Sequence, residues 1–291
     1  MGFGLCGNSG NGENSMKITN YSIFAKDVHE HGLAYAAEHT ARLGFDAVEF
    51  LATYKHAPIF ESVDAAREGK RLLDSYGLSV SCYSMLADLT VADPAQCLDR
   101  VLYHVECAAA LGSPYFHHTV IPAYKYPTPA FSYAEALETV SEKAERIVAH
   151  CAKYGIVCLY EPQGLYMNGV KGLSDLLSEM KKRHENVGIC GDTGNSLFVD
   201  VPAEEIFSAF VRDIRHIHVK DYTVTEPDGN ECRERSISGK YIRAASLGKG
   251  VNDFEKLFGY VKGYDGDVSM EFVCDDDEMR ASIEYVKELL H

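Results

Sequence analysis

The sequence of 291 residues predicts an α/β fold, namely a single (β/α)8 TIM barrel. Short apolar runs alternate eight times with amphipathic stretches of helical period. These runs are too apolar for strands with one exposed face, which favours a parallel sheet covered by helices. The length also suits one barrel, since this fold typically takes about 250 residues. A doubly wound open sheet is the alternative, but no Gly-rich dinucleotide loop follows the first predicted strand.

Each predicted element has a recognisable beginning or end. The predicted strands are 17–24, 46–51, 78–84, 114–118, 155–161, 186–192, 214–220 and 267–272. The clearest predicted helices are 28–43, 65–76, 96–111 and 132–154, and a glycine follows each of them directly. Glycine at that point is what a left-handed helix C-cap requires. The stretch from Tyr222 to about Gly250 is unusually long and predicts either a solvated surface loop or a substrate lid.

The domain organisation is predicted to be simple. Residues 1–15 are rich in Gly, Asn and Ser and predict a flexible N-terminal arm, and 16–291 predict one catalytic barrel domain. The arm has neither a basic region nor an apolar stretch, so we do not expect a secretory signal. No run approaches the roughly 18 apolar residues of a membrane span, so no membrane association is expected.

Charge and cysteine content narrow the expected partners and compartment. The net charge of −15 disfavours nucleic acid as a partner, because binding phosphate backbones needs clustered Lys and Arg. A small-molecule substrate is the more plausible ligand. The nine cysteines include no C-x-x-C pair, and several lie in apolar strand runs, where cysteine behaves as a small hydrophobe. This pattern predicts a reducing compartment, the cytoplasm.

Four polar residues stand where four of the predicted strands end. They are Glu161 in LYEPQG, Asp192 in GDTGN, His218 in HIHVKDY and Glu271 in SMEF. In a (β/α)8 barrel the carboxyl ends of the strands meet at one face, where activity resides. Three carboxylates and one imidazole suit Mn²⁺, with Mg²⁺ or Co²⁺ as alternatives, better than a thiolate zinc site. We therefore expect these four residues to bind one divalent metal.

The same motifs carry a resemblance to a known family. LGFDAVEF, LYEPQG, GDTGN, HIHVKDY, SLGKGVNDF and MEF together resemble the xylose isomerase-like TIM-barrel superfamily, in its sugar isomerase/epimerase branch. That branch includes ketose 3-epimerases, hydroxypyruvate isomerase and inosose dehydratase. The resemblance extends from about Met16 to the end of the chain. It implies carbohydrate metabolism and, by analogy only, a dimer or tetramer.

The resemblance also implies a reaction. In the epimerases of this branch a proton is removed next to a carbonyl, and the metal stabilises the resulting enediolate. Carried over, Glu161 and Glu271 are metal ligands that act as an acid/base pair, and Asp192 and His218 are ligands only. The pattern does not separate 1,2-isomerisation from epimerisation. The nearest alternative is a metal-dependent dehydratase or lyase acting on a keto-sugar or inosose; cleavage of a C-glycosidic bond and a non-catalytic sugar-binding protein are more remote.

Other residues near the predicted strand ends are candidate substrate contacts. Many relatives carry His three residues after the sixth-strand Asp, whereas this chain has Asn195, which can donate a hydrogen bond but no proton. This also argues against the abasic-site endonucleases, which need further histidines. Strand alternation puts Lys220 on the side of His218 and allows only one of His117 and His118 to face inward. The predicted substrate-binding residues are Asn195, Lys220, His118, Glu49, Gln163 and His56.

Overall fold

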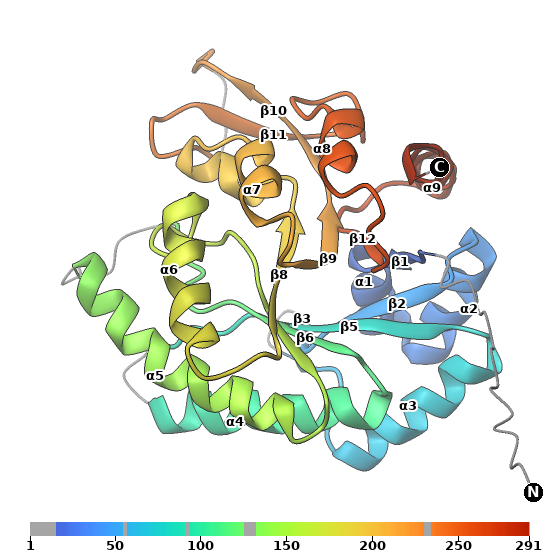
Figure 1. Ribbon diagram of the computed structural model, residues 1–291. Helices are drawn as coiled ribbons and strands as arrows, with labels where there is room; N and C mark the ends of the chain where they lie inside the picture. The colour runs from blue at the N-terminus through green and yellow to red at the C-terminus, as the bar shows by residue number, and fades with distance from the viewer. Residues whose placement is uncertain (1–15, 55–56, 91–93, 125–131, 230–233, 291) are drawn as a thin grey trace, which may run out of the picture.

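Eight parallel strands close into a barrel in a computed structural model of the protein, which describes residues 16–54, 57–90, 94–124, 132–229 and 234–290 (Figure 1). Neighbouring strands follow the order β1-β12-β9-β8-β7-β6-β5-β2, so the last barrel strand pairs with the first. The predicted (β/α)8 TIM barrel is thereby confirmed. The barrel strands are β1 (Ile18–Asn20), β2 (Ala47–Leu51), β5 (Ser79–Met85), β6 (Tyr115–His118), β7 (Val157–Tyr160), β8 (Val187–Asp192), β9 (Ile214–Val219) and β12 (Val268–Met270).

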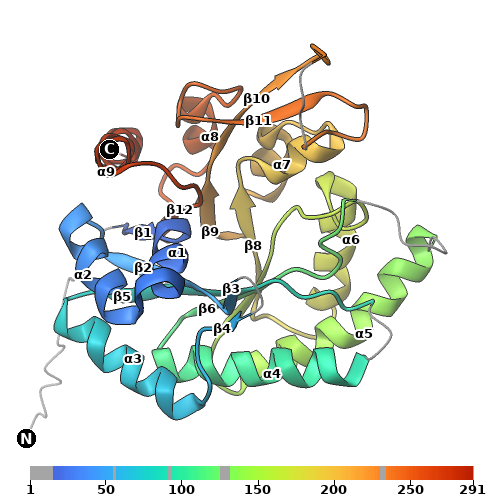
Figure 2. The same ribbon diagram turned by 180° about the vertical axis from the view of Figure 1, so that it is seen from behind.

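Helices surround this barrel, as the two opposite views show (Figures 1 and 2). They bury a continuous apolar layer against the outer face of the strands, in which Phe50, Tyr83 and Phe116 stack along adjacent strands. The helices are α1 (Ser22–His31), α2 (Leu33–Leu43), α3 (Val63–Ser75), α4 (Pro94–Leu111), α5 (Tyr133–Ala152), α6 (Gly169–Lys181), α7 (Ala203–Phe210), α8 (Phe254–Tyr260) and α9 (Asp276–Leu290), with a short 3₁₀ helix η1 (Asn195–Val199).

The first predicted strand and helix are partly wrong in extent. The strand stops at Asn20, and α1 begins at Ser22 instead of near Val28. The Asn20 side chain accepts a hydrogen bond from the Phe24 backbone N–H (3.0 Å), which satisfies one of the free donors at the helix start. The predicted helix 28–43 is interrupted at Gly32, where φ is +88°. Glycine tolerates that conformation, so α2 starts afresh from there.

The long segment after β9 forms a β-hairpin instead of an irregular loop. Strands β10 (Asp221–Thr225) and β11 (Tyr241–Ala245) pair antiparallel and project at the top of Figure 1. The hairpin is attached to η1 through hydrogen bonds from Ile237 N to Phe198 O (2.9 Å) and from Ser238 Oγ to Asp200 (2.8 Å). A small pair, β3 (Thr53–Tyr54) and β4 (Ala57–Pro58), follows β2.

The barrel interior is apolar at one end and polar at the other. Cys82, Leu159 and Cys190 point inward from three strands and form a small buried cluster. These cysteines thus pack as hydrophobes, and Cys82, Cys107, Cys151, Cys158, Cys190 and Cys274 are free thiols. The predicted N-terminal arm, 1–15, lies outside the described residues. Among the helices in the described part of the chain, none is long and apolar enough to cross a membrane.

Candidate metal centre

The four strand-end residues come together inside the barrel mouth. Glu161 follows β7, Asp192 ends β8, His218 lies in β9 and Glu271 follows β12. One ligand atom from each lies within 4.8 Å of the others. The parallel arrangement explains this convergence, because the carboxyl ends of all strands meet at the same face.

These ligand atoms form a cluster of hydrogen-bond acceptors. His218 Nδ1 lies 3.3 Å from Glu161 Oε2, 3.2 Å from Glu271 Oε2 and 3.9 Å from Asp192 Oδ2. Within the described ranges, Glu161 Oε2 and His218 Nδ1 are buried and form no hydrogen bond, and the buried Asp192 Oδ2 is in contact with the ammonium group of Lys220. Buried polar atoms without hydrogen bonds are costly, and carboxylates facing one another repel. A divalent cation supplies the missing positive charge, so the donor set fits a metal.

A buried carboxylate orients the candidate histidine ligand. Glu49, at the inner face of β2, is fully buried and accepts hydrogen bonds from His216 Nε2 (2.8 Å) and His218 Nε2 (3.0 Å). The hydroxyls of Ser84 and Ser269 also donate to it. Burial alone would raise the pKa of Glu49, but His218 and His216 lower it well below its usual value, so it has no proton to donate. His218 therefore donates from Nε2 to Glu49 and turns Nδ1 towards the cluster, where a bound metal would take the place of a proton.

Lys220 brings an ammonium group to the same cluster. Its Nζ lies 2.9 Å from Asp192 Oδ2 and 2.6 Å from Glu271 Oε2. Burial would lower the pKa of Lys220, but Asp192 and Glu271 raise it well above its usual value. Burial would raise the pKa of Glu271, but Lys220 and then His218 lower it to about 2. Lys220 and Glu271 thus remain charged near neutral pH.

The loop after β8 holds Asp192 in position. Its Oδ1 accepts hydrogen bonds from the backbone N–H groups of Gly194 (2.8 Å) and Asn195 (2.6 Å), which leaves Oδ2 for the cluster. A Cβ on Gly194 would lie 2.4 Å from Tyr222 and 2.9 Å from Lys220. Glycine is therefore needed in the GDTGN motif so that Lys220 can pass close to the backbone.

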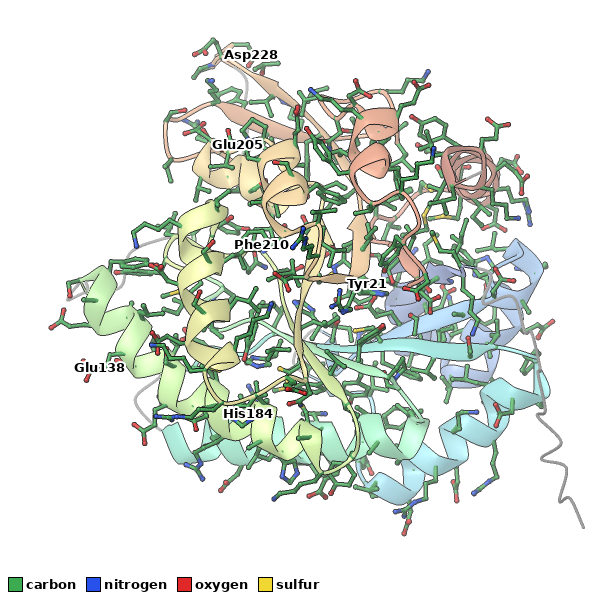
Figure 3. All side chains as sticks on the ribbon, in the orientation of Figure 1. Tyr21, Glu138, His184, Glu205, Phe210 and Asp228 are labelled. Carbon is green, nitrogen blue, oxygen red and sulfur yellow. The ribbon has the colours of Figure 1, made fainter. Side chains whose placement is uncertain are left out.

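A cavity of about 340 Å³ opens beside the cluster. Glu161 and Glu271 both line it, together with Gln163, His117 and Tyr21. The Tyr21 ring packs on His218 at 5.1 Å between centroids, and Figure 3 shows this residue near the centre of the molecule. A second cavity, of about 330 Å³, lies between η1, α7, α8 and the β10–β11 hairpin, and none of the four candidate ligands lines it.

The predicted substrate-binding residues lie in different parts of the structure. Gln163 lines the cavity, Lys220 contacts the ligand cluster, and Asn195 is buried directly after the Asp192 loop. Glu49 accepts hydrogen bonds from four protein groups, so it supports the cluster from below the cavity. His118 is not brought to the cluster, because its ring packs outside the strands against Tyr160 (5.2 Å). His56 lies outside the described residues.

Several residues of the site were not predicted individually. Glu49 accepts hydrogen bonds from His216, Ser84 and Ser269, and Tyr21 packs on His218. The available signal was strand alternation: His216 lies two residues before His218 and Ser269 two before Glu271, so each pair faces the same side of its strand.

Fold and site define a (β/α)8 barrel with an acidic cluster, of a geometry that fits a metal ion, at the carboxyl ends of its strands. The chain belongs to the xylose isomerase-like TIM barrel family, whose model matches residues 37–289. The predicted family is thereby confirmed. No curated protein matches the chain in sequence.

Solved structures share the fold at low sequence identity. D-psicose 3-epimerase from Clostridium cellulolyticum H10, solved with D-tagatose, has 17% identity and a TM-score of 0.74 over 95% of this chain and 100% of that one. A probable 3-DHS dehydratase from Bacillus anthracis has 16% identity and a TM-score of 0.72 over 94% and 99%. A xylose isomerase-like TIM barrel protein from Mycobacterium smegmatis, solved with magnesium, has 15% identity and a TM-score of 0.74 over 95% and 97%.

Proposed function

We propose that this protein is a divalent-metal-dependent sugar isomerase or epimerase that removes a proton next to a carbonyl group. The observation that carries the proposal is the placement of Glu161 and Glu271. Both carboxylates line one cavity and approach the same atom, His218 Nδ1, from different strands. A cavity of about 340 Å³ lies within the usual size range of small-molecule sites and suits a single sugar.

The proposed metal ligands are Glu161, Asp192, His218 and Glu271, with Mn²⁺ as the expected ion and Mg²⁺ or Co²⁺ as alternatives. When bound, the cation supplies positive charge that stabilises the enediolate. The protein groups do the rest. Glu161 and Glu271 act as the acid/base pair, since a general base must reach the proton it takes and both carboxylates border the substrate space. Gln163, Asn195 and Lys220 are proposed to contact the substrate.

A dehydratase reaction on a keto-sugar or inosose is the second candidate. Lys220 is compatible with it, because its ammonium group lies 2.6 Å from Glu271 Oε2 and is a proton donor for a departing hydroxyl. Lys220 serves equally well to orient a substrate oxygen, so isomerase or epimerase chemistry remains the first proposal. The structural neighbours include a probable 3-DHS dehydratase and a D-psicose 3-epimerase.

The test is proton exchange in D₂O, followed by NMR, on Mn²⁺-loaded protein diluted to trace amounts. The candidate substrates to be tested are D-psicose, D-tagatose, an aldose, an inosose and 3-dehydroshikimate. Deuterium should appear on the carbon next to the carbonyl and be lost in both Glu161→Gln and Glu271→Gln. A rearranged sugar identifies the isomerase or epimerase, and loss of water identifies the dehydratase. Proton exchange that persists in both variants would show that neither carboxylate is needed to remove the proton.

A further inference from the structure

His117 is a buried histidine with one unused nitrogen at the cavity. It is the last but one residue of β6, lies on the inner face of that strand and is 3% exposed. Its ring stands perpendicular to that of His218, with 5.5 Å between centroids. Nε2 forms no hydrogen bond among the described residues and lies 3.5 Å from Glu161 Oε1. The ring therefore borders the substrate space beside one member of the proposed acid/base pair.

The other ring nitrogen is held by Ser84. The Ser84 hydroxyl lies between Glu49 Oε1, to which it donates, and His117 Nδ1 at 2.9 Å. A hydroxyl has one hydrogen to donate and lone pairs to accept with. Because an ionised Glu49 can only accept, the Ser84 hydrogen is committed to it. The bond between Ser84 and His117 must then run from Nδ1–H to the hydroxyl oxygen.

This direction decides what Nε2 can do. A neutral imidazole carries one N–H, so a proton on Nδ1 leaves Nε2 as an acceptor. The distance to Glu161 agrees, since 3.5 Å is too long for the hydrogen bond that an Nε2–H beside a carboxylate would form. The hydrogen bonds that link Glu49, Ser84 and His117 thus leave His117 Nε2 as a hydrogen-bond acceptor at the cavity wall.

We propose that His117 Nε2 accepts a hydrogen bond from a substrate hydroxyl adjacent to the carbon that Glu161 faces, and that Ser84 sets the tautomer that makes this possible. The proposal rests on the proposed function and adds a specificity-determining residue to it. Sugars with a hydroxyl at that position should be preferred over deoxy analogues, because an analogue leaves Nε2 buried and unpaired.

The tautomer can be measured without any substrate. Protein with ¹⁵N-labelled histidine, loaded with diamagnetic Mg²⁺, is studied by two-dimensional ¹H–¹⁵N NMR, and His117→Asn identifies the His117 signals. The expected result is Nδ1–H in the wild-type protein and a shift towards Nε2–H in Ser84→Ala. An Nε2–H tautomer in the wild-type protein would overturn the inference.

The substrate contact is tested with D-psicose. Its addition should move the His117 Nε2 resonance upfield, and His117→Asn should reduce kcat/KM by about ten-fold or more while the Kd for Mn²⁺ stays unchanged. An unmoved resonance at saturating sugar would contradict the contact. A wild-type protein that neither binds nor turns over D-psicose would count against the proposed function with this sugar, and the tautomer would then decide the inference.

Discussion

Glu49 Oε1 lies 3.0 Å from His218 Nε2, although the two residues are 169 positions apart in the chain. Because the carboxylate is ionised and accepts this bond, Nε2 of the imidazole carries a proton, and Nδ1 is the nitrogen that faces the candidate metal site. Carboxylates that hold metal-binding histidines in this way orient the ring and raise its basicity. Glu49 is thereby a positioning residue for His218.

Replacing Glu49 with Gln should weaken metal binding. Gln offers an NH₂ group where four donors converge, so at least one partner loses its acceptor and His218 loses its fixed tautomer. Loss of such a supporting partner typically costs about 10- to 100-fold in metal affinity. Isothermal titration with Mn²⁺ measures this change. The matched control is Glu138→Gln on the exposed face of α5 (Figure 3), and equal affinities for the two variants would refute the role of Glu49.

Metal binding should also stabilise the fold. The cation relieves the repulsion among Glu161, Asp192 and Glu271, and a ligand at 100 times its Kd adds about 2.7 kcal/mol to the unfolding free energy. We expect EDTA to lower the Tm and Mn²⁺ to restore it. Asp192→Asn, which removes one ligand charge, should reduce this metal-dependent shift in Tm. Thermal unfolding that is the same in EDTA and Mn²⁺ would argue against a resident metal.

The four candidate ligands could be predicted because each marks the end of a short apolar strand. Strand period and the common carboxyl edge of a parallel barrel are enough to bring such residues together. Their supporting partners could not be predicted in the same way. The contact between Glu49 and His216 joins residues 167 positions apart, and it depends on which strands face each other across the barrel.

The His117–His118 pair shows a second limit. Alternation requires one of the two to face inward. A strand of only four residues, Tyr115–His118, does not by itself show which of its residues face the barrel interior. The structure resolves it through packing: Phe116 and His118 contact the outer layer, which leaves His117 for the cavity. The β10–β11 hairpin was missed because its polar sequence resembles a surface loop.

Replacing Gly194 with Ala should destabilise the protein. The added Cβ would lie 2.4 Å from Tyr222 and 2.9 Å from Lys220, so both must shift. Overpacking of this kind typically costs about 1–3 kcal/mol. Urea denaturation gives the change in unfolding free energy. The control is Gly259→Ala in α8, where a Cβ meets nothing within 4 Å and Ala is the better helix former, so that variant should be as stable as wild type or more so. Equal stability of the two variants would disprove the predicted clash.

Stability should fall in mild acid because of His104 in α4, away from the candidate metal centre. Burial, with a smaller contribution from Arg100, lowers the pKa of His104 from 6.5 to about 4, and its Nδ1 lies 2.9 Å from the Tyr83 hydroxyl. Between these two pH values the unfolded chain binds a proton that the folded protein does not. The free energy of unfolding therefore rises with pH across this window. The contribution of His104 to stability is lost as the pH falls from about 6.5 to 4.

Comparison with His104→Asn isolates this contribution, because other buried groups titrate in both proteins. At neutral pH the variant should be the less stable one, since it leaves part of the histidine's volume unfilled. As the pH falls towards 4 the wild-type protein should lose up to ~3 kcal/mol more than the variant. Urea denaturation at a series of pH values measures both curves. Parallel curves between pH 6.5 and 4 would show that His104 is already protonated in the fold and would contradict the prediction.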